Sequence, residues 1–91
     1  MKRVWIDGKH ITDMASLHSL VALSLGFPSY YGNNLDALYD CLTDLFEETE
    51  ITVTNAEYLK SSLEKGNAFL NVLKQAAEEN EEIKVSIFPG I

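Results

Sequence analysis

The sequence predicts an α/β fold, in which a three-stranded parallel sheet packs with about four helices. Three short runs rich in β-branched residues, "RVWID", "EITVTN" and "IKVSIF", are separated by longer segments of helical periodicity. Strands separated by helices generally pair in parallel, because each crossover brings the chain back to the same end of the sheet. The 91 residues contain no linker, repeat or low-complexity segment, so we expect a single domain over residues 1–91.

The first strand is the run "RVWID", which a turn-forming Asp-Gly pair closes. Thr12 can cap a first helix that runs to about Leu25. Gly26 ends this helix, and Pro28 cannot continue it because proline has no backbone N–H. The apolar residues of the helix recur three and four positions apart and predict one buried face: Met14, Leu17, Val21 and Leu25.

A second helix is expected to begin near Asn33 or Asn34, since both suit the capping position, and to run to about Phe46. At about 100° per residue, four leucines spaced three, four and three residues apart fall on one face of this helix. They are Leu35, Leu38, Leu42 and Leu45. We expect this face to pack into the core, which leaves the opposite face in solvent.

The second half of the chain repeats the pattern of strand, two helices and strand. The run of residues 50–55 is a strand, and Asn55 can cap a short helix that runs through Leu63 and is broken by Gly66. A fourth helix covers residues 67–82, with apolar residues at helical spacing. Residues 83–88 form the last strand, which a Pro-Gly pair stops.

The formal net charge of -7 is unevenly distributed along the chain. No Lys or Arg occurs from His10 through Glu57, a stretch in which acidic residues are frequent. Such a field repels phosphate backbones, whose binding depends on Lys and Arg, and it attracts cationic molecules. The sequence therefore predicts a basic partner and no binding of nucleic acid.

Cys41 is the single cysteine, so no internal disulfide can form. This fits a reducing compartment, most simply the cytoplasm. The first residues, "MKRVWID", lack the apolar core of a signal peptide, and no run approaches the roughly 20 apolar residues that span a membrane. We expect a cytoplasmic protein with no membrane segment. Because no basic neighbour in sequence would lower its pKa, Cys41 is interpreted as a structural thiol.

Acidic side chains form a row on the solvent face of the second predicted helix. Asp36, Asp40 and Asp44 are stacked four residues apart, nearly opposite the leucines, and Glu47 continues the row. Like charges at this spacing cost roughly 0.2–0.5 kcal/mol each, and no lysine on the helix relieves them. Asp44 also lies toward the end of the helix at which the macrodipole is negative.

Two tyrosines, Tyr30 and Tyr31, precede this helix on a loop beside its acidic face. Tyrosine is favoured at interfaces because it buries a large area with little loss of rotamer entropy. The acidic row could be an ordinary solvated face, since a helix must expose polar residues. The unrelieved charges and the adjacent aromatic residues favour the other interpretation, a binding surface for a cationic partner.

The segment "YYGNNLDALYDCLT", residues 30–43, resembles the signature of the barstar family of intracellular ribonuclease inhibitors. The matching pattern is Tyr-Tyr-Gly-x-Asn-Leu-Asp-Ala-Leu-x-Asp-Cys-Leu-Thr, with every spacing kept. A looser likeness covers nearly the whole chain, including "IDGKHI", "LHSL", a glycine before the fourth helix and the last strand. The resemblance implies a barstar-like fold and a non-enzymatic function, the one-to-one inhibition of a small basic ribonuclease of the barnase type by a protein that is monomeric when free.

In the family, the second helix and the loop before it block the active site of the ribonuclease. By position, the resemblance makes Asp40 the central anchor, whose carboxylate takes the place of a substrate phosphate, and Asp36 the partner of a neighbouring cation. Tyr30 would pack on an active-site side chain, and Gly32 would allow close backbone approach. The full set of expected contact residues is Tyr30, Tyr31, Gly32, Asn34, Leu35, Asp36, Tyr39, Asp40, Thr43, Asp44, Gln75 and Glu79.

The chain departs from the family at four positions near this surface. Tyr39 and Leu45 replace tryptophans, Asp44 replaces a glycine, and Gln75 replaces an acidic residue. Asp44 is the largest change, because it adds a side chain and a charge where the backbone would approach the partner. A ribonuclease with a rearranged rim, carrying an extra cation opposite Asp44, would fit these changes.

The residues give little support to catalysis. Asp36 and Asp40 could form a carboxylate pair, but no nucleophile or oxyanion donor accompanies them in the sequence. His10 and His18 are isolated, with His18 expected to be packed or on the surface of the first helix. There is no Cys–His cluster for zinc, and two aspartates four residues apart are a weak signal for a divalent cation. We expect no enzyme, no metal and no other cofactor.

One alternative function stays open at this stage. An interaction or immunity module on the same scaffold could neutralise a basic toxin or partner that is not a ribonuclease. Both functions require an acidic helix with aromatic neighbours, so the sequence does not separate them.

Overall fold

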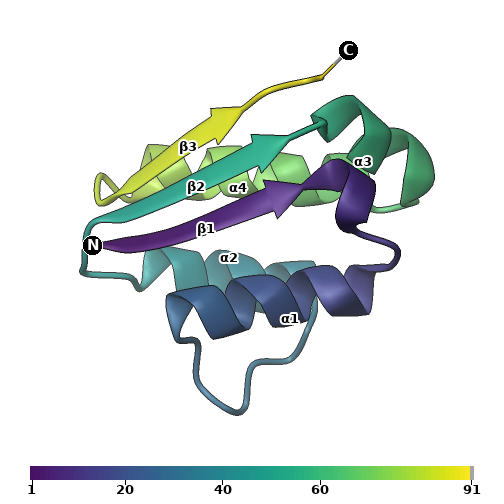
Figure 1. The fold of residues 1–91 in the computed structure, drawn as a ribbon. Coiled ribbons are helices and arrows are strands. Elements are labelled where there is room, and N and C mark those ends of the chain that lie inside the picture. Colours follow the sequence, from purple (N-terminus) through teal and green to yellow (C-terminus); the bar gives the residue numbers. More distant parts are fainter. Residues whose placement is uncertain (91) are drawn as a thin grey trace.

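The computed structural model of the protein describes residues 1–90. Three strands, β1 (Lys2–Asp7), β2 (Thr49–Thr54) and β3 (Ile83–Ile87), pair in parallel in the order β1-β2-β3. Figure 1 shows the three arrows pointing the same way, with β2 in the middle. The structure confirms the predicted α/β fold and its three-stranded parallel sheet.

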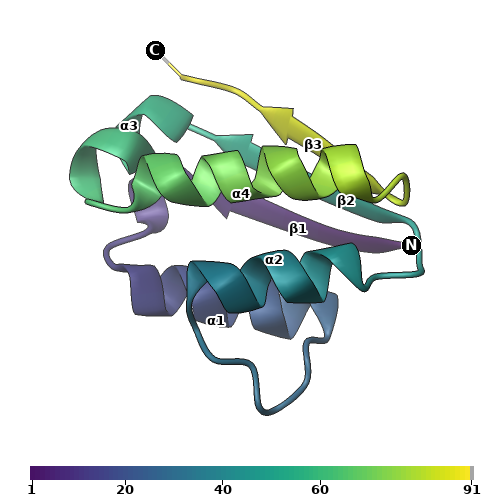
Figure 2. The ribbon, with the colours of Figure 1, turned by 180° about the vertical axis from the view of Figure 1, so that it is seen from behind.

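Four α-helices and one short 3₁₀ turn connect the strands. They are η1 (Gly8–His10), α1 (Met14–Leu25), α2 (Leu35–Thr43), α3 (Ala56–Ser62) and α4 (Gly66–Glu79). Helices α2 and α4 lie side by side, as Figure 2 shows, while α1 contacts β1 and α3 contacts both η1 and α4. The Asp-Gly pair predicted a turn at η1, but not its 3₁₀ form. It forms because the Asp7 side chain accepts a hydrogen bond from the Lys9 backbone N–H at 3.0 Å.

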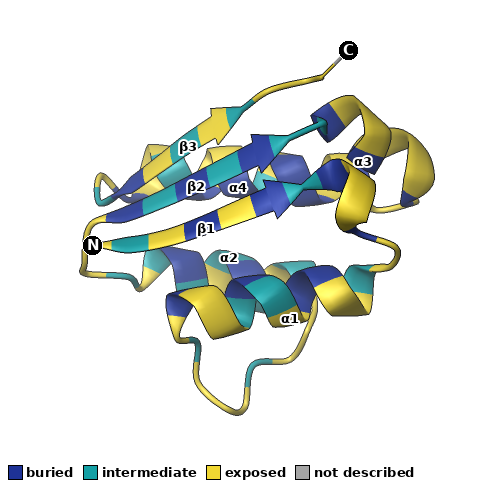
Figure 3. Cartoon of the chain, in the orientation of Figure 1, coloured by how far each residue is buried: buried dark blue, intermediate teal, exposed yellow. Residues whose placement is uncertain are grey.

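The helices cover one face of the sheet, and the hydrophobic core lies between the helices and that face. Along β1, Val4 and Ile6 are buried while the alternating Arg3 and Trp5 are exposed, as the colours of Figure 3 show. Parallel sheets are usually covered on both faces. Here the second face carries polar and aromatic side chains and meets solvent. Buried and more exposed residues therefore alternate along the three strands, which are not continuously apolar. Leu17, one of the residues predicted to face the core from α1, is fully buried.

The N-terminal cap of α1 is Asp13, not Thr12. The Asp13 carboxylate accepts a hydrogen bond from the Ser16 backbone N–H at 2.7 Å, and this bond contributes most to lowering its pKa below the usual range. A carboxylate is the better cap here because it also interacts with the positive end of the helix dipole. The Thr12 hydroxyl instead donates to the Asp13 carboxylate.

Helix α2 ends at Thr43, three residues before the predicted end at Phe46. The Leu45 N–H bonds to the Leu42 carbonyl in a tighter, three-residue step, so the chain leaves the α-helix there. The side-chain amide of Asn80 donates to carbonyls at this end of the helix, at 3.0 Å to that of Leu42 and at 2.8 Å to that of Leu45. A distant residue therefore fixes the end of α2, which the local pattern could not reveal.

The ends of α3 and α4 differ from the prediction in detail. Asn55 occupies the predicted cap position of α3, but its backbone is left-handed (φ 53°) and its amide donates to the Asp7 carboxylate at 2.8 Å, so its side chain makes no capping bond. Helix α3 ends at Ser62, one residue before the predicted Leu63, and Gly66, which was predicted to break it, is the first residue of α4. A side chain at Gly66 would overlap the backbone carbonyl of Leu59, so glycine is needed there for close packing. Helix α4 then ends at Glu79, not at residue 82.

Candidate functional site

The orientation of α2 is set at its first residues. The Asn34 side chain accepts a hydrogen bond from the Ala37 backbone N–H at 2.8 Å, which identifies Asn34 as the cap, while Asn33 has a left-handed backbone (φ 52°) that reverses the chain before it. From this start, Leu38 and Leu42 point into the core and are fully buried. Packing of this inner face fixes the rotation of the helix about its axis, so the opposite face points toward solvent.

The three aspartates of the acidic row make no ion pair within the described chain. Asp36, Asp40 and Asp44 are all exposed side chains. Among the described residues the ion pairs lie elsewhere: the amino terminus with Glu47, Arg3 with Glu50, His10 with Asp7, and Lys60 with Glu57. The repulsion among the three aspartates is thus not relieved by an ion pair among the described residues, and their carboxylates remain available to an external cation. Glu47, which continues the row, is paired with the amino terminus.

A groove beside this row joins α2 to α4. It has a volume of about 430 Å³ and is lined by Leu35, Asp36, Tyr39, Asp40, Val72 and Gln75. The structure therefore brings Gln75 together with four of the expected contact residues of α2. Glu79 is exposed one turn further along α4. The groove places an apolar floor between the carboxylates of one helix and the amide of the other.

Thr43 differs from the other expected contact residues on α2. Its hydroxyl donates to the Tyr39 backbone carbonyl at 2.9 Å and lies 3.2 Å from that of Asp40. Threonine commonly bonds back to the preceding turn in this way. The hydrogen of the Thr43 hydroxyl is therefore engaged within α2, so Thr43 can offer another molecule its methyl group and the lone pairs of its oxygen, but no donor.

The two tyrosines of the preceding loop have different environments. Tyr30 is 86% exposed, whereas Tyr31 is half-buried and packs its ring against Phe27, with ring centroids 5.0 Å apart. The Tyr31 hydroxyl bonds to Nδ1 of His18 in α1. Burial raises the pKa of Tyr31 to about 12, with a smaller contribution from Cys41. Tyr31 anchors the loop, and this leaves Tyr30 projecting from it.

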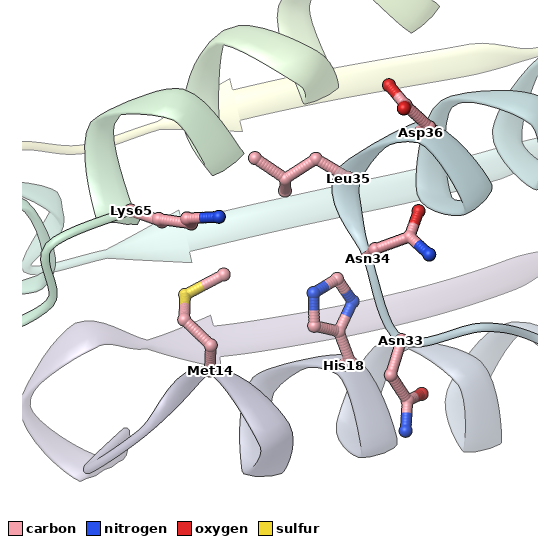
Figure 4. A pocket seen from close by; sticks show the side chains of 7 residues that line it. All are labelled: Met14, His18, Asn33, Asn34, Leu35, Asp36 and Lys65. Atoms are coloured by element: carbon pink, nitrogen blue, oxygen red, sulfur yellow. The ribbon is translucent and has the colours of Figure 1, made fainter.

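His18 is a packed residue of α1, only 3% exposed, and burial lowers its pKa. It lines a pocket at the start of α2, which Figure 4 shows from close by. The other residues around this pocket are Met14, Asn33, Asn34, Leu35, Asp36 and Lys65. In the same view Lys65 reaches from the start of α4 toward Met14 and Leu35. The first turn of α2 is thus bordered by polar groups from three helices.

Gly32 lies on the exposed part of the loop, and the fold itself does not require a glycine there. Its φ is not in the left-handed region, and an added Cβ would meet only the flexible Asn34 amide at 3.1 Å and the Ala37 methyl group at 3.8 Å. A glycine that internal packing does not demand is consistent with a requirement from outside the molecule, such as close approach of another chain.

Two residues of this region were missed by the sequence reasoning. Asn80 positions the end of α2 through the hydrogen bonds described above, and its only sequence signal is that it is the single amide in an acidic run. Phe46, which lies between Asp44 and Glu47 in the sequence, is 93% exposed. Phe46 follows the fourth leucine of the core face and does not continue its three- and four-residue spacing. Once the end of α2 is known, this position indicates that the Phe46 side chain is exposed.

The described residues show no arrangement of the kinds that metals need. In residues 1–90 no three or more His, Cys, Asp and Glu side chains gather in a group that could hold an ion.

Cys41 is half-buried, and its pKa is raised by burial and then by Asp44 and Asp40, so the thiolate is disfavoured. No helix in this part of the chain combines the length and the apolar character required to cross a bilayer.

The fold and this surface together define a small α/β protein with an exposed acidic helix face. The chain belongs to the barstar family: the model of the family described as "Barstar (barnase inhibitor)" matches residues 1–89. Proteins of this family are inhibitors and not enzymes. The chain is also 36% identical over 90 residues to the "Putative ribonuclease inhibitor YrdF" of Bacillus subtilis (strain 168), covering 96% of this chain and 99% of that protein. Both comparisons support a role as a ribonuclease inhibitor.

Proposed function

We propose that this protein inhibits a small basic ribonuclease by inserting the acidic face of α2 and the loop before it into the enzyme's active site. The observation that carries the proposal is the row of Asp36, Asp40 and Asp44, which is exposed and makes no ion pair within the described chain. Family membership gives the chemical type of the target.

The physical basis is phosphate mimicry by a rigid helix. A ribonuclease holds its anionic substrate in a pocket of cationic donors, and carboxylates satisfy those donors while offering no bond to cleave. Asp40, in the middle of the row, serves as the anchor, and Asp36 binds a neighbouring cation. Because α2 is fixed by a buried inner face, its carboxylates lose little freedom on binding.

The remaining contact residues surround this anchor. Tyr30 packs on the enzyme, Gly32 admits its backbone, and Asn34 and Thr43 mark the two ends of the contact along α2. Leu35 and Tyr39 offer apolar area beside the groove, and Gln75 and Glu79 extend the contact onto α4. Tyr31 contributes by holding the loop, through its bond to His18.

The inhibitor acts as a monomer that forms a one-to-one complex, in a cytoplasm where its single cysteine stays reduced. Opposite charges on the two proteins speed their encounter, which matters for an inhibitor that must protect RNA before it is cleaved.

The test is a calorimetric titration of the protein into a barnase-type ribonuclease, with residual RNA cleavage measured in the same samples. The proposal expects a stoichiometry of one to one and loss of cleavage at equivalence. Absence of heat and full cleavage at an excess of this protein would exclude that class of ribonuclease as the target.

One observation favours a second candidate. Asp44 is exposed at the end of the acidic row, where the family has a glycine, so the surface is suited to a partner with an additional cation. A basic toxin other than a ribonuclease would satisfy the same surface. Immobilised protein and an Asp40→Ala control, incubated with extract of the source cell, would separate the candidates: a basic nuclease captured only by the unaltered protein supports the first, and a basic protein without nuclease activity supports the second.

A further inference from the structure

A second pocket lies where α2 ends and adjoins the proposed binding face. It measures about 430 Å³ and is formed between the last turn of the helix and the loop that precedes it. Phe27, Pro28 and Tyr30 line it from the loop, and Leu45 and Phe46 line it from the segment after α2. The two outermost aromatic side chains are 86% and 93% exposed, so a pair of rings stands open to solvent at the pocket's edge.

The same pocket is lined by three carboxylates, Asp40, Asp44 and Glu47, of which Glu47 pairs with the amino terminus at 3.7 Å. Its only lysine, Lys2, directs its ammonium group to the Leu25 backbone carbonyl at 2.6 Å, and none of the ion pairs among the described residues involves either aspartate. The thiol of Cys41, also in the lining, has its pKa raised by burial and further by these two aspartates, in keeping with a negative potential inside the pocket.

We propose that this pocket receives an arginine side chain of the protein partner. Its aliphatic stem would lie between Tyr30 and Phe46, and its guanidinium group would bind Asp44 and Asp40. Arginine suits the pocket better than lysine, because a planar guanidinium with its fixed set of donors can bond to two carboxylates at once. The inference rests on the proposed function and names a chemical feature of the partner: a cation at the rim, beside the group that meets Asp40.

Asp44 and Phe46 are thus specificity residues. The anchor at Asp40 would be shared by any ribonuclease whose active site binds phosphate. The contact at Asp44 and Phe46 is available only to a partner with a rim arginine, and an unpaired Asp44 disfavours the others. The chain would therefore discriminate among related enzymes through residues outside the anchor.

The pocket can be tested without the partner by using N-butylguanidinium as a probe for an arginine side chain. The uncharged isostere N-butylurea is the matched control. Backbone amide spectra recorded during the titration should show saturable shifts confined to the segments around Tyr30 and residues 40–47, with affinity in the low millimolar range. N-butylurea should produce no saturable shift there. Equal responses to both compounds, or shifts spread over the acidic surface without saturation, would overturn the inference.

Variants locate the contact. Asp44→Asn and Phe46→Ala should each weaken N-butylguanidinium binding at least threefold, while Asp44→Glu, which keeps the charge, should retain most of it. Glu64→Gln removes an exposed carboxylate that does not line the pocket and should leave the affinity unchanged. Amide spectra of the free variants verify that each is folded. A loss of affinity in Glu64→Gln equal to that in Asp44→Asn would show a general charge effect and contradict the pocket.

This outcome and that of the ribonuclease titration are independent. Saturable probe binding without ribonuclease binding would uphold the arginine pocket and refute the proposed function. Ribonuclease inhibition without probe binding would uphold the proposed function and refute the arginine pocket. If both are positive, Asp44→Asn should also weaken binding of that ribonuclease at least threefold, and an unchanged affinity would refute the specificity role of Asp44.

Discussion

The side-chain amide of Asn80 donates a hydrogen bond of 2.8 Å to the backbone carbonyl of Leu45. The same amide nitrogen lies 3.0 Å from the Leu42 carbonyl oxygen, and the Asn80 side-chain oxygen accepts a bond from the Glu82 N–H. One buried side chain therefore joins the end of α2 to the turn between α4 and β3. The acidic row depends on this connection, because it fixes where α2 stops.

Replacing Asn80 should destabilise the protein. Asn80→Ala leaves carbonyl groups at the end of α2 without their donor, and an unsatisfied buried polar group costs about 1–3 kcal/mol. Urea unfolding should show this loss. Asn71→Ala removes an exposed amide from α4, the helix that Asn80 follows, and should change the unfolding free energy by less than about 0.5 kcal/mol. Equal effects of the two substitutions would contradict the role of Asn80.

Asp40→Ala should weaken ribonuclease binding severely, while Lys60→Ala should have almost no effect. Removing one member of a desolvated charge pair costs roughly 2–5 kcal/mol, a range for which the barnase–barstar complex is itself a reference case. Lys60 pairs with Glu57 on α3, on the surface and away from α2. Calorimetry on both variants would measure the difference. Comparable losses of affinity would exclude the proposed face.

Association with the ribonuclease should slow steeply as salt is added. The screening length falls from about 30 Å at 0.01 M to about 8 Å at 0.15 M ionic strength, so the long-range attraction of the acidic row is largely lost. Stopped-flow kinetics should show a falling association rate and a nearly constant dissociation rate. An association rate independent of salt would mean that the row is only a solvated face.

His18 should make the protein less stable as the pH falls below about 6.5. Burial lowers the pKa of His18 from its ordinary value of 6.5, so below that pH the unfolded chain takes up a proton that the folded protein does not. Unfolding free energy should therefore decrease from pH 6.5 downward and be unaffected by His18 above it. The carboxyl groups of Asp7 and Asp13, whose pKa values are lowered from 3.8, contribute only at more acidic pH. Urea unfolding of His18→Asn should lack the loss just below pH 6.5; an unchanged slope would refute the assignment.

Cys41 should react slowly with alkylating reagents, and Asp44 should be part of the reason. Burial, Asp44 and Asp40 raise the pKa of the thiol above 9.0, and the thiolate is the reactive form. The pH dependence of iodoacetamide alkylation would measure this pKa. Asp44→Asn should shift the profile to lower pH, while Glu64→Gln should not. A profile insensitive to both substitutions would mean that the field of Asp44 does not reach the thiol.

The repeating order of strand and helices could be predicted because each strand is short, rich in β-branched residues and bounded by turn residues. The leucine spacing of α2 was sufficient to place Leu38 and Leu42 inward, and hence Asp36, Asp40 and Asp44 outward. The helix ends were harder, because they depend on competition between distant groups. Asp13 is a better cap than Thr12 because its carboxylate is charged. The end of α2 depends on Asn80, a residue more than thirty positions away in the sequence.

The candidate site was predictable as far as it lies on one helix. The family resemblance added Gln75 and Glu79 on α4, and the structure places Gln75 at the groove beside α2. The different roles of Tyr30 and Tyr31 were not predictable from adjacent identical residues, because they depend on where His18 and Phe27 lie in three dimensions. The pocket at the end of α2 escaped prediction because the helix was expected to continue through it.

The sheet face that the helices leave uncovered has a practical consequence for fluorescence spectroscopy. Trp5, the chain's single tryptophan, lies on that face, is 68% exposed, and bonds through its indole N–H to Thr54. Its emission should therefore resemble that of tryptophan in water even in the native protein. It also lies on the side of the sheet away from α2, so it would keep its surroundings when a partner binds. A change in tryptophan emission on complex formation would come from the partner, which makes the partner's own indoles the natural probe of this interface.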